Sequence, residues 1–522
     1  MFQTFRNIKR LLFVARTLAA HDALVPHEYA KSAPASLRLV ARILSKRNSA
    51  DAGLPPGVRL AKALELIGPS AIKFGQLLAT RPDFIDPEIA RGLESLQDRL
   101  PPFPESEARA LVEVELGRSL DSVFASFSPP VAAASIAQVH EAVTTDDPPL
   151  RVAVKILRPG IVDDFARDFE AFRFAARTAE RFSAEARRLR AVTLVETLAR
   201  SVALELDLRM EGSAACELAE NMRAEVEFRV PRLDWSRTSA KVLTTEWIDG
   251  TPLRDAAALS AAGHDPKHLA VIVMRTFLTQ ALRDGFFHAD LHPGNLFADA
   301  EGRACAVDFG IMGRLDSGMR RFMAETLGGF LTRDYMRVAA VHFDAGFVPR
   351  HHDVETFAQA LRAVGEPIFG RPLRDMSMAR LLDQLFATTR RFDMQAQPQL
   401  ILLQKTMMVV EGVCRQLDAE FDIWETSRPV IERWMVDNLG PEARFRDAAE
   451  GLGAMGKLAQ NIPQLLRDTE LIAAQLADGG LRLHPDSVRA IATTHARRTR
   501  HVRVALWIGA GALGVLAYGI IR

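Results

Sequence analysis

Residues 288–295 read HADLHPGN and residues 307–310 read VDFG, and these two strings decide the fold. Within them the polar side chains of Asp290, Asn295 and Asp308 follow one another at intervals of 5 and 13 residues. An acid, an amide and a second acid in this order are groups that position a nucleophile and hold magnesium beside phosphates. The strings therefore predict Asp290 as the catalytic residue and Asn295 and Asp308 as magnesium ligands.

A lysine upstream fits the same chemistry. The segment RVAVKIL (151–157) reads as a β-strand in which Lys155 stands where the VAIK motif has its lysine. The next helical stretch offers four acidic partners: Glu205, Asp207, Glu211 and Glu217. Together with DxxxxN and DFG, this lysine resembles the nucleotide-binding set of protein kinases. We therefore expect an α+β, protein-kinase-like two-lobe fold.

The pattern of apolar residues and Pro-rich breaks predicts the organisation of the chain. Between about residues 128 and 157, alternating apolar residues predict two strands joined by the polar turn TTDDPP. Five parts are expected: an N-terminal helical extension (1–125), an N-lobe with a helical insert (126–255), a C-lobe (256–440), a helical tail (441–503) and a transmembrane helix (504–521).

The predicted membrane helix rests on residues 504–521, which carry no charge over 18 residues. A helix of that length reaches about 27 Å, close to the thickness of the hydrocarbon core. Arginines precede this segment, so we expect a single-pass protein of a bacterial-type inner membrane with its catalytic domain in the cytoplasm. The first 20 residues are basic and amphipathic, and the pattern leaves open whether they bind a membrane surface or pack on the protein.

Several other classes of protein are disfavoured. Lys plus Arg (66) nearly equal Asp plus Glu (65), which argues against a nucleic-acid partner recognised by bulk charge. His288 and His292 flank Asp290, but no third and fourth ligand accompanies them, so a transition-metal site is not predicted and His288 is expected to stabilise the loop. The GxGxxG strings at 451–456 and 509–514 lack the βαβ context of a dinucleotide site.

The segment GPSAIKFGQLLATRPD (68–83) adds a KxGQ motif formed by Lys73, Gly75 and Gln76. In a chain with the strings above, this motif resembles the UbiB family of atypical kinase-like proteins. The resemblance runs from about residue 60 to residue 315 and includes an alanine-rich AAASIAQVH in place of a glycine-rich phosphate loop. It departs from the usual family wording at Leu291, where proline is common, and at Gly212, where alanine is usual, and neither change removes a functional group.

The resemblance implies roles for three of the four acidic residues of the helical stretch. Lys155 would pair with Glu211. Lys73 would reach into the nucleotide pocket towards Glu205 and Asp207, the ExD pair of the family. Because Lys73 lies in an otherwise uncharged run, it also needs an acidic partner or a phosphate on physical grounds.

The remaining site residues follow from the same resemblance. Ala133, Ala134 and Ser135 would form the phosphate loop, and Glu246 would lie at the link between the lobes, where adenine bonds to the backbone. The implied cofactors are ATP and Mg²⁺. Alanine in place of glycine limits positive φ and close approach of the backbone to phosphate, so this loop is expected to hold phosphate differently from that of protein kinases.

The resemblance implies that this protein is an ATPase or a small-molecule or lipid kinase that supports ubiquinone biosynthesis. Its partners would be membrane lipid, prenylated quinone precursors and other enzymes of the pathway. No APE motif follows Asp308, which disfavours a protein substrate. Two alternatives stay open: a 2-polyprenylphenol 6-hydroxylase, for which the sequence shows no flavin or metal site, and a pseudokinase scaffold that binds nucleotide without turnover.

Overall fold

The computed structural model describes residues 2–24, 51, 53–79, 89, 92–93, 96, 101–182, 187, 190–369, 388, 391–394 and 397–439. The chain divides into two compact units, Met1–Leu439 and Gly440–Arg522, and the described residues all belong to the first. The predicted helical tail and transmembrane helix therefore lie outside the described residues. The domain limits drawn from the sequence remain predictions.

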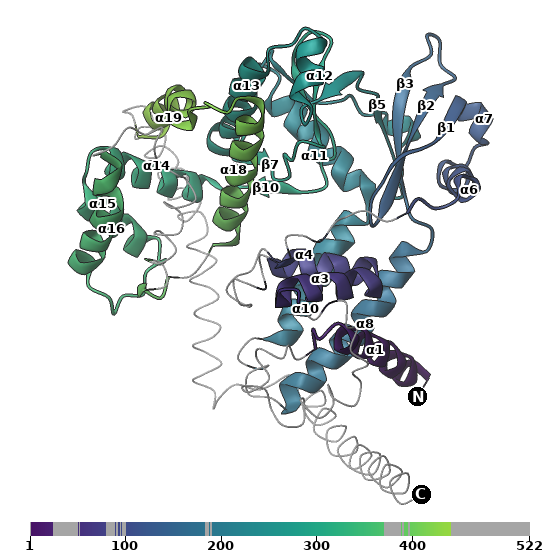
Figure 1. Ribbon diagram of the computed structural model, residues 1–522, viewed down its shortest axis with the longest axis horizontal. Coiled ribbons are helices and arrows are strands. Elements are labelled where there is room, and N and C mark those ends of the chain that lie inside the picture. Colours follow the sequence, from purple (N-terminus) through teal and green to yellow (C-terminus); the bar gives the residue numbers. More distant parts are fainter. Residues whose placement is uncertain are drawn as a thin grey trace, which may run out of the picture. The chain divides into compact units, whose positions relative to one another are not determined.

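An antiparallel sheet of four strands carries the VAVK lysine (Figure 1). Its order is β1-β2-β3-β5, formed by Phe124–Ala133, Ala137–Thr144, Arg151–Leu157 and Val242–Glu246. Side chains of β2 alternate between buried and half-buried along most of its length, as expected of a strand that covers a core on one face. Val154 and Ile156 on β3 pack on Ala108 and Val112 of helix α6 (Glu105–Leu116), which precedes the short helix α7 (Leu120–Val123).

The hairpin predicted between residues 128 and 157 is present, but its first half is two strands. The chain turns after β1, where the Ala134 N–H donates to the Ala137 carbonyl at 2.8 Å. Strand β2 then pairs with β3 in a register that places Val139 opposite Lys155. Alternation alone did not reveal this turn, because its residues are apolar or small and carry no Gly or Pro signal.

Helices from two parts of the sequence pack together beside this sheet. The extension contributes α1 (Phe2–Ala20), α3 (Pro56–Ile67) and α4 (Pro69–Ala79), and the insert contributes α8 (Ile161–Phe182), α10 (Ala191–Glu205) and α11 (Leu208–Asn221). Helix α1 lies against α3 and α8, and α4 lies against α3, α8 and α10. Phe165 and Phe169 of α8 pack on Val195 and Leu198 of α10 in a shared core.

The second half of the described chain is mainly helical. Its strands form a sheet of order β4-β9-β8-β6 (Phe228–Arg229, Ala304–Ala306, Leu296–Asp299 and Gly250–Pro252) and a pair β7-β10 (Phe286–His288 and Met312–Arg314). Its helices are α12 (Ala256–Ala261), α13 (Pro266–Leu278), α14 (Ser317–Leu331), α15 (Tyr335–Asp344), α16 (Val354–Phe369), α18 (Pro398–Leu417) and α19 (Ile423–Leu439). A 3₁₀ turn at Trp235–Arg237 and a π-helical turn at Thr279–Asp284 complete the described elements.

One core joins the elements that hold the catalytic strings. Phe277 of α13, Phe287 of β7, Ala306 of β9 and Val410 of α18 are fully buried within it.

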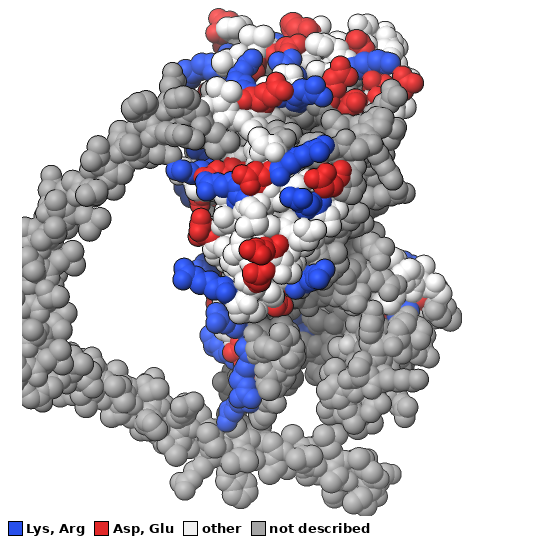
Figure 2. Space-filling model, turned by 90° about the vertical axis from the view of Figure 1, so that its left-hand side faces the viewer, with Lys and Arg blue, Asp and Glu red and all other residues white. Residues whose placement is uncertain are grey.

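On the described part of one face, basic and acidic side chains are interspersed instead of gathered by sign (Figure 2).

The prediction of a transmembrane helix and of a single-pass location is corrected. No helix within the described residues is long and apolar enough to cross a membrane. The longest described helices carry too many charges: α8 begins with Asp163 and Asp164 in its first turn, and α18 contains Lys405, Glu411 and Arg415. Segment 504–521, on which the prediction rested, lies outside the described residues.

Candidate nucleotide site

Lys155 lies between two carboxylates that come from distant parts of the chain. Its ammonium Nζ is 2.8 and 3.0 Å from the two oxygens of Glu211 on α11 and 2.9 Å from Oδ1 of Asp308 in the DFG string. Asp308 has a left-handed backbone (φ 64°), which aspartate tolerates better than most residues. The predicted contact between Lys155 and Glu211 is therefore present, and the same ammonium holds the predicted magnesium ligand.

The three groups set one another's charge. Burial raises the pKa of Glu211 to about 7, and the negative charge of Asp308 adds to that rise although Lys155 opposes it. Burial would also raise the pKa of Asp308, but the Lys155 ammonium outweighs it and holds that pKa well below its usual range. Burial opposes the charge of Lys155, yet the two carboxylates raise its pKa. Lys155 thus favours the ionised form of both carboxylates, while burial opposes it most effectively at Glu211.

The loop that carries Asp290 is held by His288, as the sequence predicted. The Asp290 backbone N–H donates to Nδ1 of His288 at 3.1 Å, so Nδ1 is unprotonated and Nε2 is the nitrogen that donates to the Val307 carbonyl, at 3.4 Å. His288 is fully buried, and burial lowers its pKa, which keeps the imidazole neutral. The side chain of Asp290 is nearly half exposed, and its Oδ2 lies 3.9 Å from Nε2 of His292.

Asn295 is tied to both catalytic strings. Its side-chain Nδ2 donates to the Asp290 carbonyl at 3.1 Å, and its own carbonyl accepts from the Val307 N–H at 2.9 Å, one residue before Asp308. Because Nδ2 is the donor to this loop, the amide oxygen faces away from that bond. The structure thus links Asp290, Asn295 and Asp308 through a short network of hydrogen bonds around Val307.

An arginine braces the alanine-rich loop. Arg158 donates through Nε and Nη2 to the Ala134 carbonyl, at 3.1 and 2.9 Å, and through Nη2 to the Pro101 carbonyl at 2.8 Å. Ser135 is fully buried, and its hydroxyl has no hydrogen-bond partner among the described residues. A buried hydroxyl without a partner is costly, so this oxygen is suited to a ligand such as a phosphate.

Lys73 of the KxGQ motif contacts the ExD pair. Its Nζ lies 2.9 Å from Oε2 of Glu205, and both side chains are mostly buried, at 10% and 25% exposed. Asp207 caps the N-terminus of α11 and accepts from the Arg209 guanidinium at 2.7 and 2.9 Å, and that guanidinium lowers its pKa. The expected contact between Lys73 and the ExD pair is therefore present through Glu205.

Glu246 ends β5, as its predicted place at the link between the lobes requires. Its backbone N–H donates to the Arg232 carbonyl at 2.7 Å, and the next N–H, that of Trp247, donates to the Arg151 carbonyl at 3.0 Å. Its carboxylate forms ion pairs with Arg229 and, at 3.6 Å, with Arg232. The side chain thus fixes the link, a role that the sequence did not suggest.

Comparison with known protein families assigns this arrangement to a class of protein. Residues 95–342 match the ABC1 atypical kinase-like domain, and residues 361–422 match the UbiB helical domain. The fold and its site therefore define an atypical kinase-like protein, and the kinase-like α+β prediction stands without its membrane helix.

Relatives extend the similarity over most of the chain, and several carry the name "Probable protein kinase UbiB". One from Marinobacter nauticus is 41% identical over 80% of this chain and 77% of its own length. Others from Azotobacter vinelandii and Pseudomonas putida are 43% and 41% identical, over 79% and 89% of this chain and 78% and 85% of theirs. The chain belongs to the UbiB family.

A solved structure of a Mycobacterium tuberculosis protein in complex with erythromycin is also similar. It is 24% identical, with a TM-score of 0.47, and the likeness covers 68% of this chain and 90% of that one. At this TM-score the likeness adds nothing to the assignment.

Proposed function

We propose that this protein binds ATP with Mg²⁺ and hydrolyses it, or transfers its phosphoryl group to a small or lipid acceptor, in support of ubiquinone biosynthesis. The observation that carries the proposal is Lys155 held between Glu211 and Asp308 at 2.8 and 2.9 Å. A lysine fixed by a helical glutamate and placed beside a DFG aspartate is the arrangement that orients ATP phosphates in kinases.

The residues present fit a magnesium ion. Asn295 and Asp308 would hold it, since amide and carboxylate oxygens are the hard ligands that Mg²⁺ prefers. When bound, the metal would neutralise charge on the phosphates. Asp290, which is open to solvent, would accept the proton of the attacking hydroxyl or water.

The chain that follows the DFG string supports a small or lipid acceptor, such as a prenylated quinone precursor. Strand β10 begins at Met312, soon after Gly310 of the DFG string, and helix α14 already begins at Ser317. This leaves little chain for the activation segment on which protein kinases dock a peptide. The name of the relatives does not exclude a protein acceptor, so the experiment must include one.

The test is phosphate release and phosphoryl transfer by purified protein with Mg-ATP, with a solubilised prenylated phenol, phospholipid or a generic protein substrate as acceptor. Asp290→Asn should lower turnover by at least about 100-fold, because general acid-base groups contribute that much or more. The variant should keep the ATP affinity of the wild type. Binding of ATP without turnover by the wild type would point to the scaffold instead, and rapid phosphorylation of the generic protein would refute the proposed acceptor class.

A further inference from the structure

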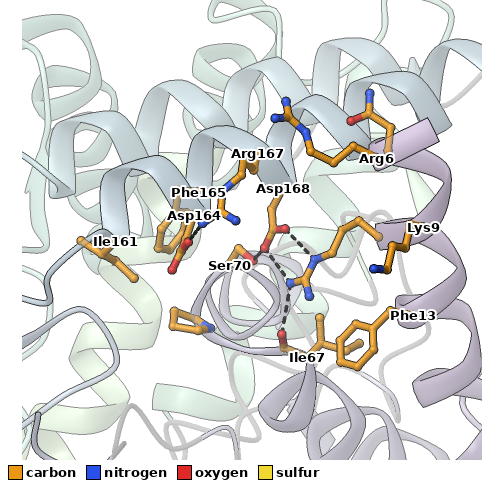
Figure 3. Close-up of a pocket in the computed structure, with 13 residues that line it drawn as sticks. Arg6, Lys9, Phe13, Ile67, Ser70, Ile161, Asp164, Phe165, Arg167 and Asp168 are labelled. Carbon is orange, nitrogen blue, oxygen red and sulfur yellow. Dashed lines mark hydrogen bonds and ion pairs between the residues drawn. The ribbon is translucent and has the colours of Figure 1, made fainter. Parts of the chain in front are cut away.

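A second pocket, of about 490 Å³, lies among α1, α4 and α8 (Figure 3). Its size falls within the range of small-molecule sites. None of the residues assigned above to the nucleotide site lines it. In Figure 3 side chains of α1, among them Arg6, Lys9 and Phe13, line it together with Asp164 and other side chains of α8.

Both carboxylates of this pocket have a basic partner within its lining. Asp168 accepts from Arg10 at 2.6 and 2.7 Å and also from the Ser70 hydroxyl. Asp164 forms an ion pair with Arg167. Asp168 is therefore satisfied by its own partners, whereas the pair of Asp164 with Arg167 is open to water, with side chains 55% and 56% exposed.

Two basic side chains of α1 remain available. Lys9 is exposed, and no acid pairs with it among the described residues. Arg6 lies 3.0 Å from Glu170, but the two side chains are 57% and 36% exposed, and ion pairs this open to water contribute little. An anion with a higher charge than a carboxylate would displace such a pair at small cost.

The backbone adds to the positive potential. Pro69 and Ser70 begin helix α4, Ile161 begins helix α8, and all three residues line the pocket. Pro69 has no N–H, and the Ile161 N–H donates to the Arg158 carbonyl at 3.2 Å, so these ends act through the partial positive charge of a helix N-terminus, which favours an anion over an uncharged ligand. Two such ends and two available cations suit a dianion better than a monoanion.

Apolar side chains form the rest of the lining. Phe13 comes from α1, Ile67 from the end of α3, and Phe165 from α8. A free inorganic ion would leave these apolar side chains without a contact. A ligand that also carries a short hydrophobic group would pack against them while its charge meets the basic side chains.

We propose that this pocket binds an organic phosphate monoester with a small apolar group, held by Lys9 and Arg6 and separate from the nucleotide site. A soluble ester and the headgroup of a lipid share this chemistry. The experiment must therefore distinguish them, and it must keep the nucleotide site filled.

The test is calorimetric titration of the full chain with phenyl phosphate, dihexanoyl phosphatidic acid, inorganic phosphate and phenol, with and without a saturating non-hydrolysable ATP analogue. The double variant Arg6→Gln, Lys9→Gln should lower affinity for the ester about 2- to 30-fold, since two charged contacts that are open to water are lost. Arg16→Gln is the matched control, because Arg16 is an exposed cation of the same helix that does not line the pocket. Phe13→Ala should weaken phenyl phosphate but not inorganic phosphate.

The outcomes separate cleanly. Binding of phenyl phosphate identifies a soluble ester as the ligand class, and binding of the phosphatidic acid alone identifies a lipid headgroup. No saturable binding of either, equal loss in Arg16→Gln and in the double variant, or competition by the ATP analogue would overturn the proposal. Failure of ATP turnover would not, because this pocket is assayed by binding alone.

Discussion

Replacing Asp308 by asparagine should remove metal binding while the fold is retained. One ammonium and two carboxylates, those of Glu211 and Asp308, give the Lys155 cluster a formal charge of −1. In Asp308→Asn the ammonium keeps Glu211 at 2.8 Å, so a neutral pair remains, with side chains 16% and 8% exposed. No buried charge loses its last partner, and we expect the free energy of unfolding to change by less than about 1 kcal/mol.

Magnesium-dependent ATP binding should respond much more. Loss of one charged contact to the metal removes about 1.5–3 kcal/mol, or about 10- to 150-fold in affinity. The assay is titration with a fluorescent ATP analogue at several Mg²⁺ concentrations, with thermal unfolding measured in parallel. Asp316→Asn is the matched control. Asp316 caps α14 by accepting from the Met319 N–H at 2.7 Å, and asparagine caps a helix equally well.

The result that refutes this reasoning is specific. If Asp308→Asn unfolds like the wild type and binds ATP with unchanged dependence on Mg²⁺, Asp308 is not a metal ligand. If the variant loses stability by several kcal/mol, the carboxylate is structural and the charge balance assigned to Lys155 is wrong.

Two further predictions concern the neighbours of this cluster. Lys73→Met and Glu205→Gln should be non-additive by about 1–2 kcal/mol in the free energy of unfolding, because the pair is mostly buried; additivity within about 0.5 kcal/mol would show that it contributes nothing. Binding of Mg-ATP should release a proton near pH 7, because burial and Asp308 raise the pKa of Glu211 to about 7 and a cation at Asp308 cancels that repulsion. The bound state then holds fewer protons, so affinity should rise with pH up to about 7 and level off above it. Calorimetry in two buffers of different ionisation enthalpy measures the release, and Glu211→Gln should abolish it.

The sequence allowed the contacts between oppositely charged motif residues to be predicted. Lys73 lies in an otherwise uncharged run, so it needed an acid or a phosphate, whereas the choice of Glu211 among four acids for Lys155 came from the resemblance to the family. Arg158 could not be found in this way. It braces the candidate phosphate loop through the carbonyls of Ala134 and Pro101, and a carbonyl is present at every residue, so such a contact leaves no pattern in the sequence.

Asp207 shows a second limit of motif reasoning. The ExD motif places Glu205 and Asp207 two residues apart, yet Glu205 ends α10 whereas Asp207 caps α11 and binds Arg209. A helix boundary between two motif residues turns their side chains toward different partners. Periodicity predicted both helices but not the residue at which one gives way to the next, which depends on the cap.

That boundary connects the KxGQ motif to the kinase-like lysine. Lys73 binds the last residue of α10, and Glu211 lies in the first turn of α11, six residues further along the chain. Asp207, between them, fixes the start of α11 by accepting from the Arg209 N–H at 3.1 Å. A shift of α4 that pulls on Glu205 therefore acts at the end of the helix that presents Glu211 to Lys155. We accordingly expect Lys73→Met to weaken ATP binding through this junction. Arg16→Met, at an exposed position of α1, should leave ATP affinity unchanged, and equal effects of the two substitutions would contradict the coupling.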